Sequence, residues 1–476
     1  MTQTGTLTDQ LRAADQTHLI DALDRLDADE QRPLIAQLES IPWTEIPALI
    51  DTYVRTAPEF ALPGDVAPAP YYPYDPGSSV RAWDEPAALE AGQQLIRDGK
   101  VAAFVVAGGQ GTRLGYNGPK GCYPAGAISG KPLFAFFADN LLGARDRFGV
   151  RVPLYVMTSP LNHDATVAFF RDQNNFGLDA RDVMFFPQGV MPSFDRETAR
   201  VLLASPNRIA TNPDGHGGSI RALHVSGALD DMKRRGIEHL SYFQVDNPIV
   251  NVLDPVFLGL HAAANDSSAQ MSSKMVTKAY PEEKVGLFCT SAGRTQVVEY
   301  SDMPMDRQKE TADDGELLFR AGSIAIHAFS VAFVEKLASD AAFALPYHRA
   351  DKKVPYYDPK SEQLIQPLDP NGVKLERFVF DALPLAEKSI VYQTARPIEF
   401  APIKNAEGVD SAESSKIIQT ERAALWLERA GVEIPRREDD HADCTIELSP
   451  RTASRAQHLN GADLPKSIAR GQRLAL

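Results

Sequence analysis

The 476-residue sequence contains only three cysteines and no long apolar segment. Cys122, Cys289 and Cys444 have neither the spacing of zinc ligands nor the even number that a disulfide framework requires. No apolar run approaches the ~20 residues that cross a bilayer, and the first residues, MTQTGTLTDQ, lack a signal-peptide pattern. We therefore expect a protein of the reducing cytoplasm that does not span a membrane.

Positive charge is also scarce, since 49 basic residues are outnumbered by 63 acidic ones and the net charge is -14. This balance opposes non-specific binding to nucleic acid or to an anionic membrane. The P-loop signature G-K-[ST] and the zinc-protease signature H-E-x-x-H are both missing. Any phosphate that the protein binds must therefore be held by a local pocket of another kind.

The pattern of apolar residues changes along the chain. Residues 7–54 repeat apolar side chains at helical spacing, and prolines then crowd together between Pro58 and Pro76, which favours an extended linker. Beyond the linker, short apolar runs alternate with helical patterns, as in a parallel α/β sheet. We expect strands at residues 101–107, 153–157, 240–245, 296–300 and 324–329, and a helix over residues 220–235.

A glycine-rich turn, AGGQGTRLG at residues 107–115, follows the first expected strand. In open α/β sheets ligands bind at the carboxyl ends of strands, and exposed amides in such a turn attract anionic oxygens. Glycines alone favour an ordinary tight turn, but Arg113 and Lys120 add two cations that suit a polyphosphate. The dinucleotide fingerprint G-x-G-x-x-G is imperfectly spaced, so an NAD-dependent oxidoreductase has little support.

A second glycine cluster, NPDGHGGS at residues 212–219, directly precedes an expected helix. The free amides of a helix start attract anions or polar ligand groups, whereas Asp214-Gly215 is also a common turn dipeptide. The cluster is therefore read equally well as a binding site or as a turn. Asp246 ends another expected strand in VDNP, where it is either an Mg²⁺ ligand or the cap of a turn.

Two later motifs carry further candidates. Lys404, in FAPIKN, is able to reach a phosphate, although a lone loop lysine is usually solvated. Phe378 and Phe380 alternate in FVFD and are expected on one face of a strand, where core packing is their default role. The ten histidines, including His216 and His327, have no identified acid or nucleophile partner.

Seven motifs in order, AGGQGTRLG with PKG, FPQG, PDGHGG, VDN, VVEYS, PNGVKLERFVFD and PIKN, resemble those of the UDP-sugar pyrophosphorylase family, closest to its UDP-N-acetylhexosamine branch. The resemblance covers nearly the whole chain. It implies an α/β fold with a Rossmann-like, GT-A-like nucleotidyltransferase domain and a mixed, mainly parallel sheet over residues 96–385. An N-terminal helical region with its linker (residues 1–95) and a small C-terminal α+β domain (residues 386–476) would flank this domain.

The resemblance also implies roles for individual residues. Arg113, Lys120 and Lys404 would be catalytic cations, and Asp246 would bind Mg²⁺, or Mn²⁺ in its place. The residues implied in binding UTP and the sugar phosphate are Gly108, Gly109, Gln110, Gly111, Thr112, Gln188, Gly217, Gly218, Asn247, Glu299, Ser323, Phe378 and Phe380.

The reaction implied is UTP plus a sugar 1-phosphate, foremost N-acetylglucosamine 1-phosphate, giving a UDP-sugar and pyrophosphate. Two positions depart from the family pattern: His216 replaces an asparagine, and Ser323 replaces an asparagine that would hydrogen-bond the sugar. The alternatives are therefore a UDP-glucose or broad UDP-sugar pyrophosphorylase, and a non-catalytic UDP-sugar-binding protein. We expect a monomer or weak homo-oligomer without nucleic-acid or membrane partners.

Overall fold

The computed structural model describes residues 3–57, 60–340 and 344–476. The start of the expected linker, residues 58–59, therefore lies outside the described residues. Two compact units are present, and each is built from segments distant in sequence. The first unit comprises Met1–Ala61, Gln188–Ser219 and Leu345–Asp381, and the second comprises Leu62–Pro187, Ile220–Ala344 and Ala382–Leu476.

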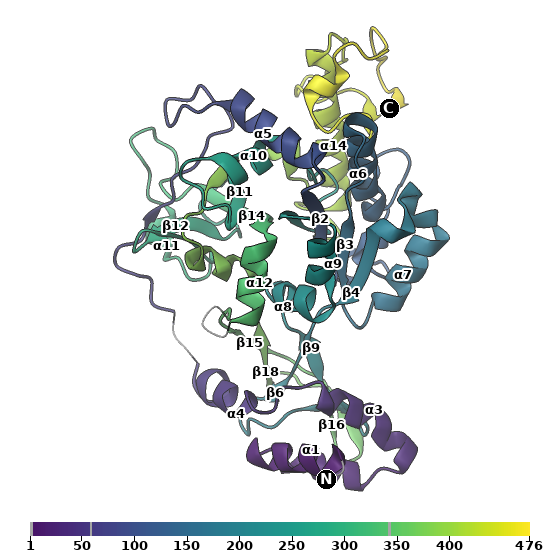
Figure 1. The fold of residues 1–476 in the computed structure, drawn as a ribbon, viewed down its shortest axis with the longest axis vertical. Coiled ribbons are helices and arrows are strands. Elements are labelled where there is room, and N and C mark those ends of the chain that lie inside the picture. Colours follow the sequence, from purple (N-terminus) through teal and green to yellow (C-terminus); the bar gives the residue numbers. More distant parts are fainter. Residues whose placement is uncertain (1–2, 58–59, 341–343) are drawn as a thin grey trace. The chain divides into compact units, whose positions relative to one another are not determined.

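The first unit begins with the expected helical region (Figure 1). Asp27 caps α3 by accepting from the amide of Glu30, whose side chain in turn accepts from the amide of Asp27. The helices are α1 (Gln3–Ala13), α2 (Thr17–Asp24), α3 (Ala28–Glu39) and α4 (Ile46–Leu49), followed by a π-helical turn at Ile50–Arg55.

Short strands from the two later segments complete this unit. β6, β15 and β18 form a three-stranded sheet, while β5 pairs with β9, β7 with β8 and β16 with β17. Leu11, Leu19 and Leu34 of the helices share one buried apolar cluster with Phe194 and Leu375 of the strands. The strands are β5 (Val190–Pro192), β6 (Phe194–Asp195), β7 (Leu203–Ser205), β8 (Arg208–Ile209), β9 (Thr211–Pro213), β15 (His348–Lys352), β16 (Tyr356–Asp358), β17 (Gln363–Ile365) and β18 (Gly372–Glu376).

A ten-stranded mixed sheet is the centre of the second unit, with the order β1-β12-β14-β10-β2-β3-β4; β11 and β19 extend it from β14, and β13 pairs with β12. β10, β2, β3 and β4 run parallel, whereas β14 is antiparallel to β10. The strands are β1 (Ala67–Pro68), β2 (Val101–Val106), β3 (Leu154–Thr158), β4 (Val183–Pro187), β10 (His239–Gln244), β11 (Met271–Thr277), β12 (Leu287–Ser291), β13 (Arg294–Val298), β14 (Ala321–Ser330) and β19 (Val391–Gln393).

All five expected strands are thus present, and the prediction of a mixed α/β sheet is confirmed. The helix expected over residues 220–235 is two helices, because Gly227 adopts a left-handed backbone (φ 78°) between them. The helices are α5 (Glu85–Arg97), α6 (Leu133–Phe148), α7 (His163–Asp172), α8 (Gly218–Val225), α9 (Ala228–Arg234), α10 (Pro255–Ala263), α11 (Met305–Gln308), α12 (Val331–Ser339), α13 (Arg396–Glu399) and α14 (Ala412–Arg429).

The chain's last segment packs around α14 with the short parallel pair β20 (Thr445–Glu447) and β21 (Arg473–Ala475). Trp426 and Leu427 share a small apolar cluster there with Ile446. The three-part division expected from the sequence stays a prediction. Within the described ranges, no helix combines the length and hydrophobicity that a bilayer span requires.

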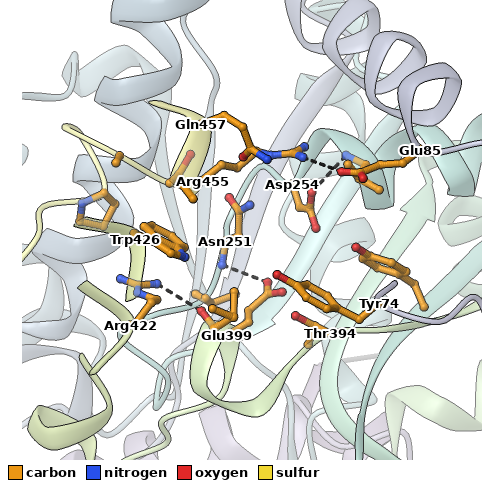
Figure 2. Close-up of a pocket in the computed structure, with 18 of the residues that line it drawn as sticks. Tyr74, Glu85, Asn251, Asp254, Thr394, Glu399, Arg422, Trp426, Arg455 and Gln457 are labelled. Carbon is orange, nitrogen blue, oxygen red and sulfur yellow. Dashed lines mark hydrogen bonds and ion pairs between the residues drawn. The ribbon is translucent and has the colours of Figure 1, made fainter. Parts of the chain in front are cut away.

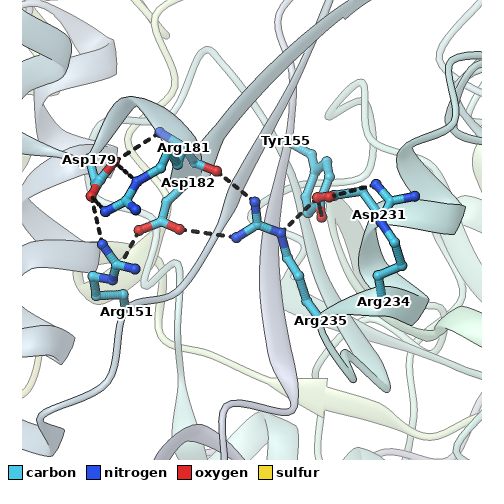
Figure 3. Close-up of polar contacts among 8 residues, drawn as sticks. All are labelled: Arg151, Tyr155, Asp179, Arg181, Asp182, Asp231, Arg234 and Arg235. Carbon is cyan, nitrogen blue, oxygen red and sulfur yellow. Dashed lines mark hydrogen bonds and ion pairs between the residues drawn. The ribbon is translucent and has the colours of Figure 1, made fainter.

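A polar network fastens α9 to the β3–β4 edge of the sheet (Figure 3). The Tyr155 hydroxyl donates to the Asp231 carboxylate over 2.7 Å. Arg235 joins Asp231 to Asp182, which precedes β4, through bonds of 2.8 and 3.0 Å. Burial, together with the bond to Asp231, raises the pKa of Tyr155. The network therefore links β3 and the start of β4 to α9 and the residue that follows it.

Candidate active site

The glycine-rich turn follows β2 and folds back on itself. The amide of Gly111 donates to the Gly118 carbonyl over 2.9 Å, and the amide of Lys120 donates to the Gly109 carbonyl over 3.0 Å. A Cβ at Gly111 would lie 2.8 Å from the Tyr116 ring, so this position requires glycine. The fold of the turn brings Lys120 next to the glycines, as the sequence predicts.

The buried side chain of Asn162 is hydrogen-bonded to this turn. Sequence reasoning did not identify this role. The residue is 1% exposed, and its Nδ2 donates to the carbonyls of Ala107 and Gly109 over 3.0 and 3.2 Å. Its Oδ1 accepts from the amide of Ser159 over 2.7 Å. Nothing in the surrounding SPLNH sequence marks the residue, because the two carbonyls to which it donates are more than fifty positions upstream.

Asp246 lies just beyond the end of β10, beside the glycine turn. β10 and β2 are parallel neighbours with Gln244 opposite Val106, so the loops that follow them share one edge of the sheet. Asp246 Oδ2 is 3.7 Å from Lys120 Nζ, and both side chains are largely buried. The Asp246 carboxylate and the Lys120 ammonium group therefore lie together at the carboxyl edge of the sheet.

Two further cations, Lys404 and Arg113, act electrostatically on Lys120. Burial lowers the pKa of Lys120, the positive charges of Lys404 and Arg113 lower it further, and Asp246 opposes the shift. An incoming phosphate would relieve the repulsion among these three cations. The cluster is thus suited to binding a polyphosphate.

Lys404 is positioned through its backbone rather than its side chain. The amide of the preceding residue, Ile403, donates to the Asp246 carbonyl over 2.8 Å, and the amide of Lys404 donates to the Asp410 carbonyl over 2.6 Å. Its Nζ is 3.9 Å from Asp410 Oδ2 and 5.5 Å from the Phe400 ring centroid. The segment that carries Lys404 is thereby hydrogen-bonded to the residue that carries the carboxylate.

Asn247 strengthens the same connection. Its Nδ2 donates to the Glu399 carbonyl over 2.6 Å, and its Oδ1 accepts from the amide of Ala401 over 3.2 Å. The side chain expected to bind substrate thus holds the segment that leads to Lys404. Its amide is a positioning group in this structure.

A cavity of about 70 Å³ opens between these elements, and Ser323 on β14 is part of its wall. The amide of Ser323 donates to the Gly286 carbonyl over 2.8 Å. A Cβ at Gly286 would lie 3.2 Å from Glu299 Oε1, so Ser323 and Glu299 flank this glycine. The residues lining the cavity include Gln244, Asp246, Asn247, Ser323, Ile324, Phe400 and Lys404.

The remaining predicted residues, Gln188, Gly217, Gly218, Phe378 and Phe380, gather in the first unit. The Gly189 carbonyl accepts from the amide of Asp214, and the Asp214 carbonyl accepts from the amide of Arg377. A Cβ at Gly217 would lie 2.7 Å from the backbone of residues 377–378, and one at Gly218 would lie 2.1 Å from Asp214. Within this unit, the glycine cluster therefore requires glycine for close packing.

The expectation that Phe378 and Phe380 lie on a strand is wrong. β18 ends at Glu376, and the following residues form an irregular link and the 3₁₀ segment Val379–Leu385. The two rings pack against a histidine instead. His216 is stacked on Phe378 at 5.2 Å and tilted against Phe380 at 5.7 Å.

His216 accepts a hydrogen bond at Nδ1 from the amide of Val379 over 3.1 Å. Burial and the neighbouring His348 lower its pKa from 6.5 to about 4. The unfolded chain therefore protonates this ring at a higher pH than the folded protein does. Stability is lost as the pH falls from 6.5 toward 4.

We expect His216→Asn to remove this loss, which amounts to at most about 3 kcal/mol. The measurement is the free energy of unfolding of both proteins by urea between pH 7 and about 4. The free energy of unfolding of the variant, relative to that of the parent, should rise as the pH falls. A difference that is constant over this range would contradict the low pKa of His216.

The residues of this site fit the metal that the sequence leads us to expect. Among the residues the structure describes, no group of three or more His, Cys, Asp or Glu side chains is placed to hold a metal. Mg²⁺ requires no such group, because it commonly binds through one or two carboxylates plus the phosphate oxygens of a substrate. Asp246, facing the cavity beside three cations, fits that mode of binding.

The site combines a carboxylate with several cations at the carboxyl edge of a Rossmann-like sheet. Such a site suits a reaction between two highly charged phosphate groups. The fold and the site are therefore those of a nucleotidyltransferase. Comparison with known proteins gives the family. Residues 81–434 match the family model of UTP–glucose-1-phosphate uridylyltransferase, and the chain belongs to this family of uridylyltransferases.

The most similar relatives include UDP-N-acetylglucosamine pyrophosphorylase of Saccharomyces cerevisiae, which is 35% identical over 88% of this chain and 90% of its own. UDP-N-acetylhexosamine pyrophosphorylase-like protein 1 of Homo sapiens is 37% identical over 89% of this chain and 85% of its own. The crystal structure of the Trypanosoma brucei uridine diphosphate N-acetylglucosamine pyrophosphorylase in complex with inhibitor matches with a TM-score of 0.79 and 25% identity, covering 98% of each chain. These matches confirm the resemblance seen in the sequence.

The lowered pKa of Lys120 leads to a second prediction. If the charged form of Lys120 binds the triphosphate, kcat/KM for UTP falls as the pH rises through the pKa of this residue. We expect the fall to begin below the usual range of lysine, near 10.4. Lys120→Arg keeps its charge at all these pH values and should shift the fall to higher pH. Identical alkaline profiles for the two proteins would contradict this assignment.

Proposed function

We propose that this protein is a uridylyltransferase that makes UDP-N-acetylglucosamine and pyrophosphate from UTP and N-acetylglucosamine 1-phosphate. Membership of the uridylyltransferase family and the names of the relatives support the reaction. The observation that carries the proposal is the Lys120–Asp246 ion pair beside a cavity that both Asp246 and Lys404 line. The charges of Lys404 and Arg113 also act on Lys120. Such a cluster lowers the repulsion between a triphosphate and a sugar phosphate.

The reaction forms one bond and breaks one at the α-phosphorus of UTP. A phosphate oxygen of the sugar 1-phosphate attacks in line, and the bond to the oxygen shared with the β-phosphate breaks, so that pyrophosphate leaves with the electron pair. The attacking oxygen is already anionic, and therefore no general base is required. The work of the protein is positioning and electrostatic stabilisation.

Individual residues divide this work. The glycine turn after β2 would hold the phosphates of UTP with Arg113 and Lys120, and Lys404 would bind the sugar phosphate. Asp246 would hold Mg²⁺ or Mn²⁺, and the ion, when bound, neutralises charge on the phosphates. Asn247 and Asn162 keep Lys404 and the glycine turn in their positions.

Ser323 stands where the family pattern has an asparagine, and its hydroxyl is shorter than the asparagine amide that would hydrogen-bond the sugar. UDP-glucose pyrophosphorylase activity is therefore the second candidate. The test is pyrophosphate release from UTP and Mg²⁺ with the 1-phosphates of N-acetylglucosamine, N-acetylgalactosamine, glucose and galactose. Turnover mainly with the acetylated sugars supports the first candidate, and turnover mainly with glucose 1-phosphate supports the second. Binding of UDP-sugar without turnover would overturn both.

Three further expectations belong to the same proposal. All three cysteines are free thiols, which suits the reducing cytoplasm. The substrates are small molecules, so neither nucleic acid nor membrane is a required partner. A monomer or a weak homo-oligomer is the expected state, and light scattering of the purified protein would measure it.

A further inference from the structure

A second and larger cavity, of about 330 Å³, lies in the second unit (Figure 2). Its volume is within the range of small-molecule sites. Segments that are distant in sequence line it, among them the residues around Tyr74, the loop after β10, α13, α14 and residues 450–457. Tyr74, Tyr392 and Trp426 give it aromatic surface.

Arg422 of α14 is the most unusual group in this cavity. The residue is 6% exposed, and its guanidinium donates only to the carbonyls of Ile249 and Ile398, over 3.0 and 3.5 Å. Its Nε has no acceptor among the described residues, and the guanidinium lies 4.9 Å from the Trp426 ring centroid. Burial lowers its pKa to about 10, and the charge of Glu399 opposes that shift. A buried N–H donor without an acceptor favours a ligand that brings an oxygen to it.

Two carboxylates of the cavity share one buried lysine. Lys274 is fully buried and contacts Asp254 over 2.7 Å and Glu399 over 2.6 Å. Glu85 is likewise paired, with Arg455 over 2.9 Å. The cavity is therefore lined by ionised groups of both signs, and within the described residues the Nε of Arg422 is a donor without an acceptor.

Two more polar atoms of the lining lack partners within the described residues. They are Nη1 of Arg455, a donor, and Oδ1 of Asn251, an acceptor. The two arginine donors suit the oxygens of a carboxylate or phosphate. The asparagine oxygen requires a donor such as a hydroxyl.

We propose that this cavity is an effector site for a small organic oxyanion, a carboxylate or a phosphate, that also bears a hydroxyl group. The cavity shares its walls with the catalytic segments. Val250 lines both this cavity and the one around Asp246. Glu399 faces this cavity with its side chain, while its carbonyl accepts from Asn247. An occupant therefore contacts the two segments that position Asp246 and Lys404.

Binding is measured by intrinsic fluorescence, a readout that does not depend on turnover. Of the three tryptophans, Trp426 lines the cavity. The probes are glycerate and glycerol 3-phosphate, with glycerol as the neutral control. We expect at least one anion, and not glycerol, to change the fluorescence of the full-length protein. In Trp426→Phe this signal should disappear while calorimetry still records heat of binding. The two anions separate a carboxylate site from a phosphate site.

Variants locate the binding. Arg422→Met should weaken it about ten- to a hundredfold, as expected for the loss of a charge-assisted bond. Lys416→Met, which removes a cation from the same helix outside this cavity, should leave it unchanged, and so should Lys404→Ala. If Arg422→Met does not fold, Asn251→Asp, which adds a negative charge of nearly the same shape, should also weaken binding.

Three results would overturn the proposal. The first is no response to either anion at concentrations up to about 10 mM. The second is equal affinity in the parent and in both cavity variants. The third is loss of binding in Lys404→Ala, which would place the anion in the catalytic cavity. None of these results depends on whether the protein transfers uridylyl groups, so the failure of one proposal is distinguishable from that of the other.

Discussion

Replacing Lys404 by alanine is expected to reduce kcat about 10²- to 10³-fold while leaving the fold intact. In the proposed mechanism the ammonium group would neutralise charge as the sugar phosphate approaches the α-phosphorus, and an alanine would leave that charge unbalanced. The surrounding structure should persist, because the segment is held by the backbone bonds of Ile403 and Lys404 and by Asn247. Steady-state kinetics with UTP and the preferred sugar phosphate measure the effect.

The matched control is Lys388→Ala, which removes an exposed lysine whose bonds are made by its backbone. Its kcat should equal that of the parent. Lys404→Arg should retain part of the activity, since the charge remains while its position changes. Nearly normal turnover by Lys404→Ala, with circular dichroism unchanged, would show that Lys404 does not contact the reacting phosphates.

The second large effect is expected from Asp246→Asn. The amide has nearly the same shape as the carboxylate but no charge, so it would weaken the proposed Mg²⁺ site and leave Lys120 without its counterion. We expect kcat/KM to fall about 10³-fold or more and the Mg²⁺ concentration needed for half-maximal activity to rise. Initial rates over a range of Mg²⁺ concentrations, at fixed substrates, provide both values.

Asp230→Asn on the surface of α9 is the control, because it removes one carboxylate that is 68% exposed and distant in sequence from the cavity residues. Its Mg²⁺ dependence should match that of the parent. An unchanged Mg²⁺ response in Asp246→Asn would mean that the ion binds elsewhere. Because the variant keeps the backbone carbonyl that accepts from Ile403, a change in activity is not explained by release of that segment.

Much of the second unit was predictable because its signals are local. Each buried parallel strand is a short apolar run, and the glycine turn and Asp246 follow at strand ends. Parallel strands share one carboxyl edge, which brings the turn and Asp246 together, and the folding of the turn brings Lys120 back to them. Lys404 was predicted from its motif and from the resemblance, and the structure adds the backbone bond that ties its segment to Asp246.

The remainder depended on contacts between distant residues, which local patterns do not record. The helices at the start of the chain share their core with strands near residues 194 and 375, although their apolar spacing shows only that they have a buried face. Asn162 looks like any loop asparagine until the carbonyls it binds are known. Phe378 and Phe380 alternate as in a strand, but their stacking on His216 replaces strand pairing.

The hydrogen bond from the Ile403 amide to the Asp246 carbonyl has a consequence for how such an enzyme changes its preferences. It fixes the spacing between the Asp246 segment and the Lys404 segment through the main chain. Replacement of a side chain does not remove it. Ser323 and Phe400, which line the same cavity, take no part in that bond. We therefore expect variants of Ser323 alone to change the preferred acceptor while they still turn over, because the bond between Ile403 and Asp246 is left in place.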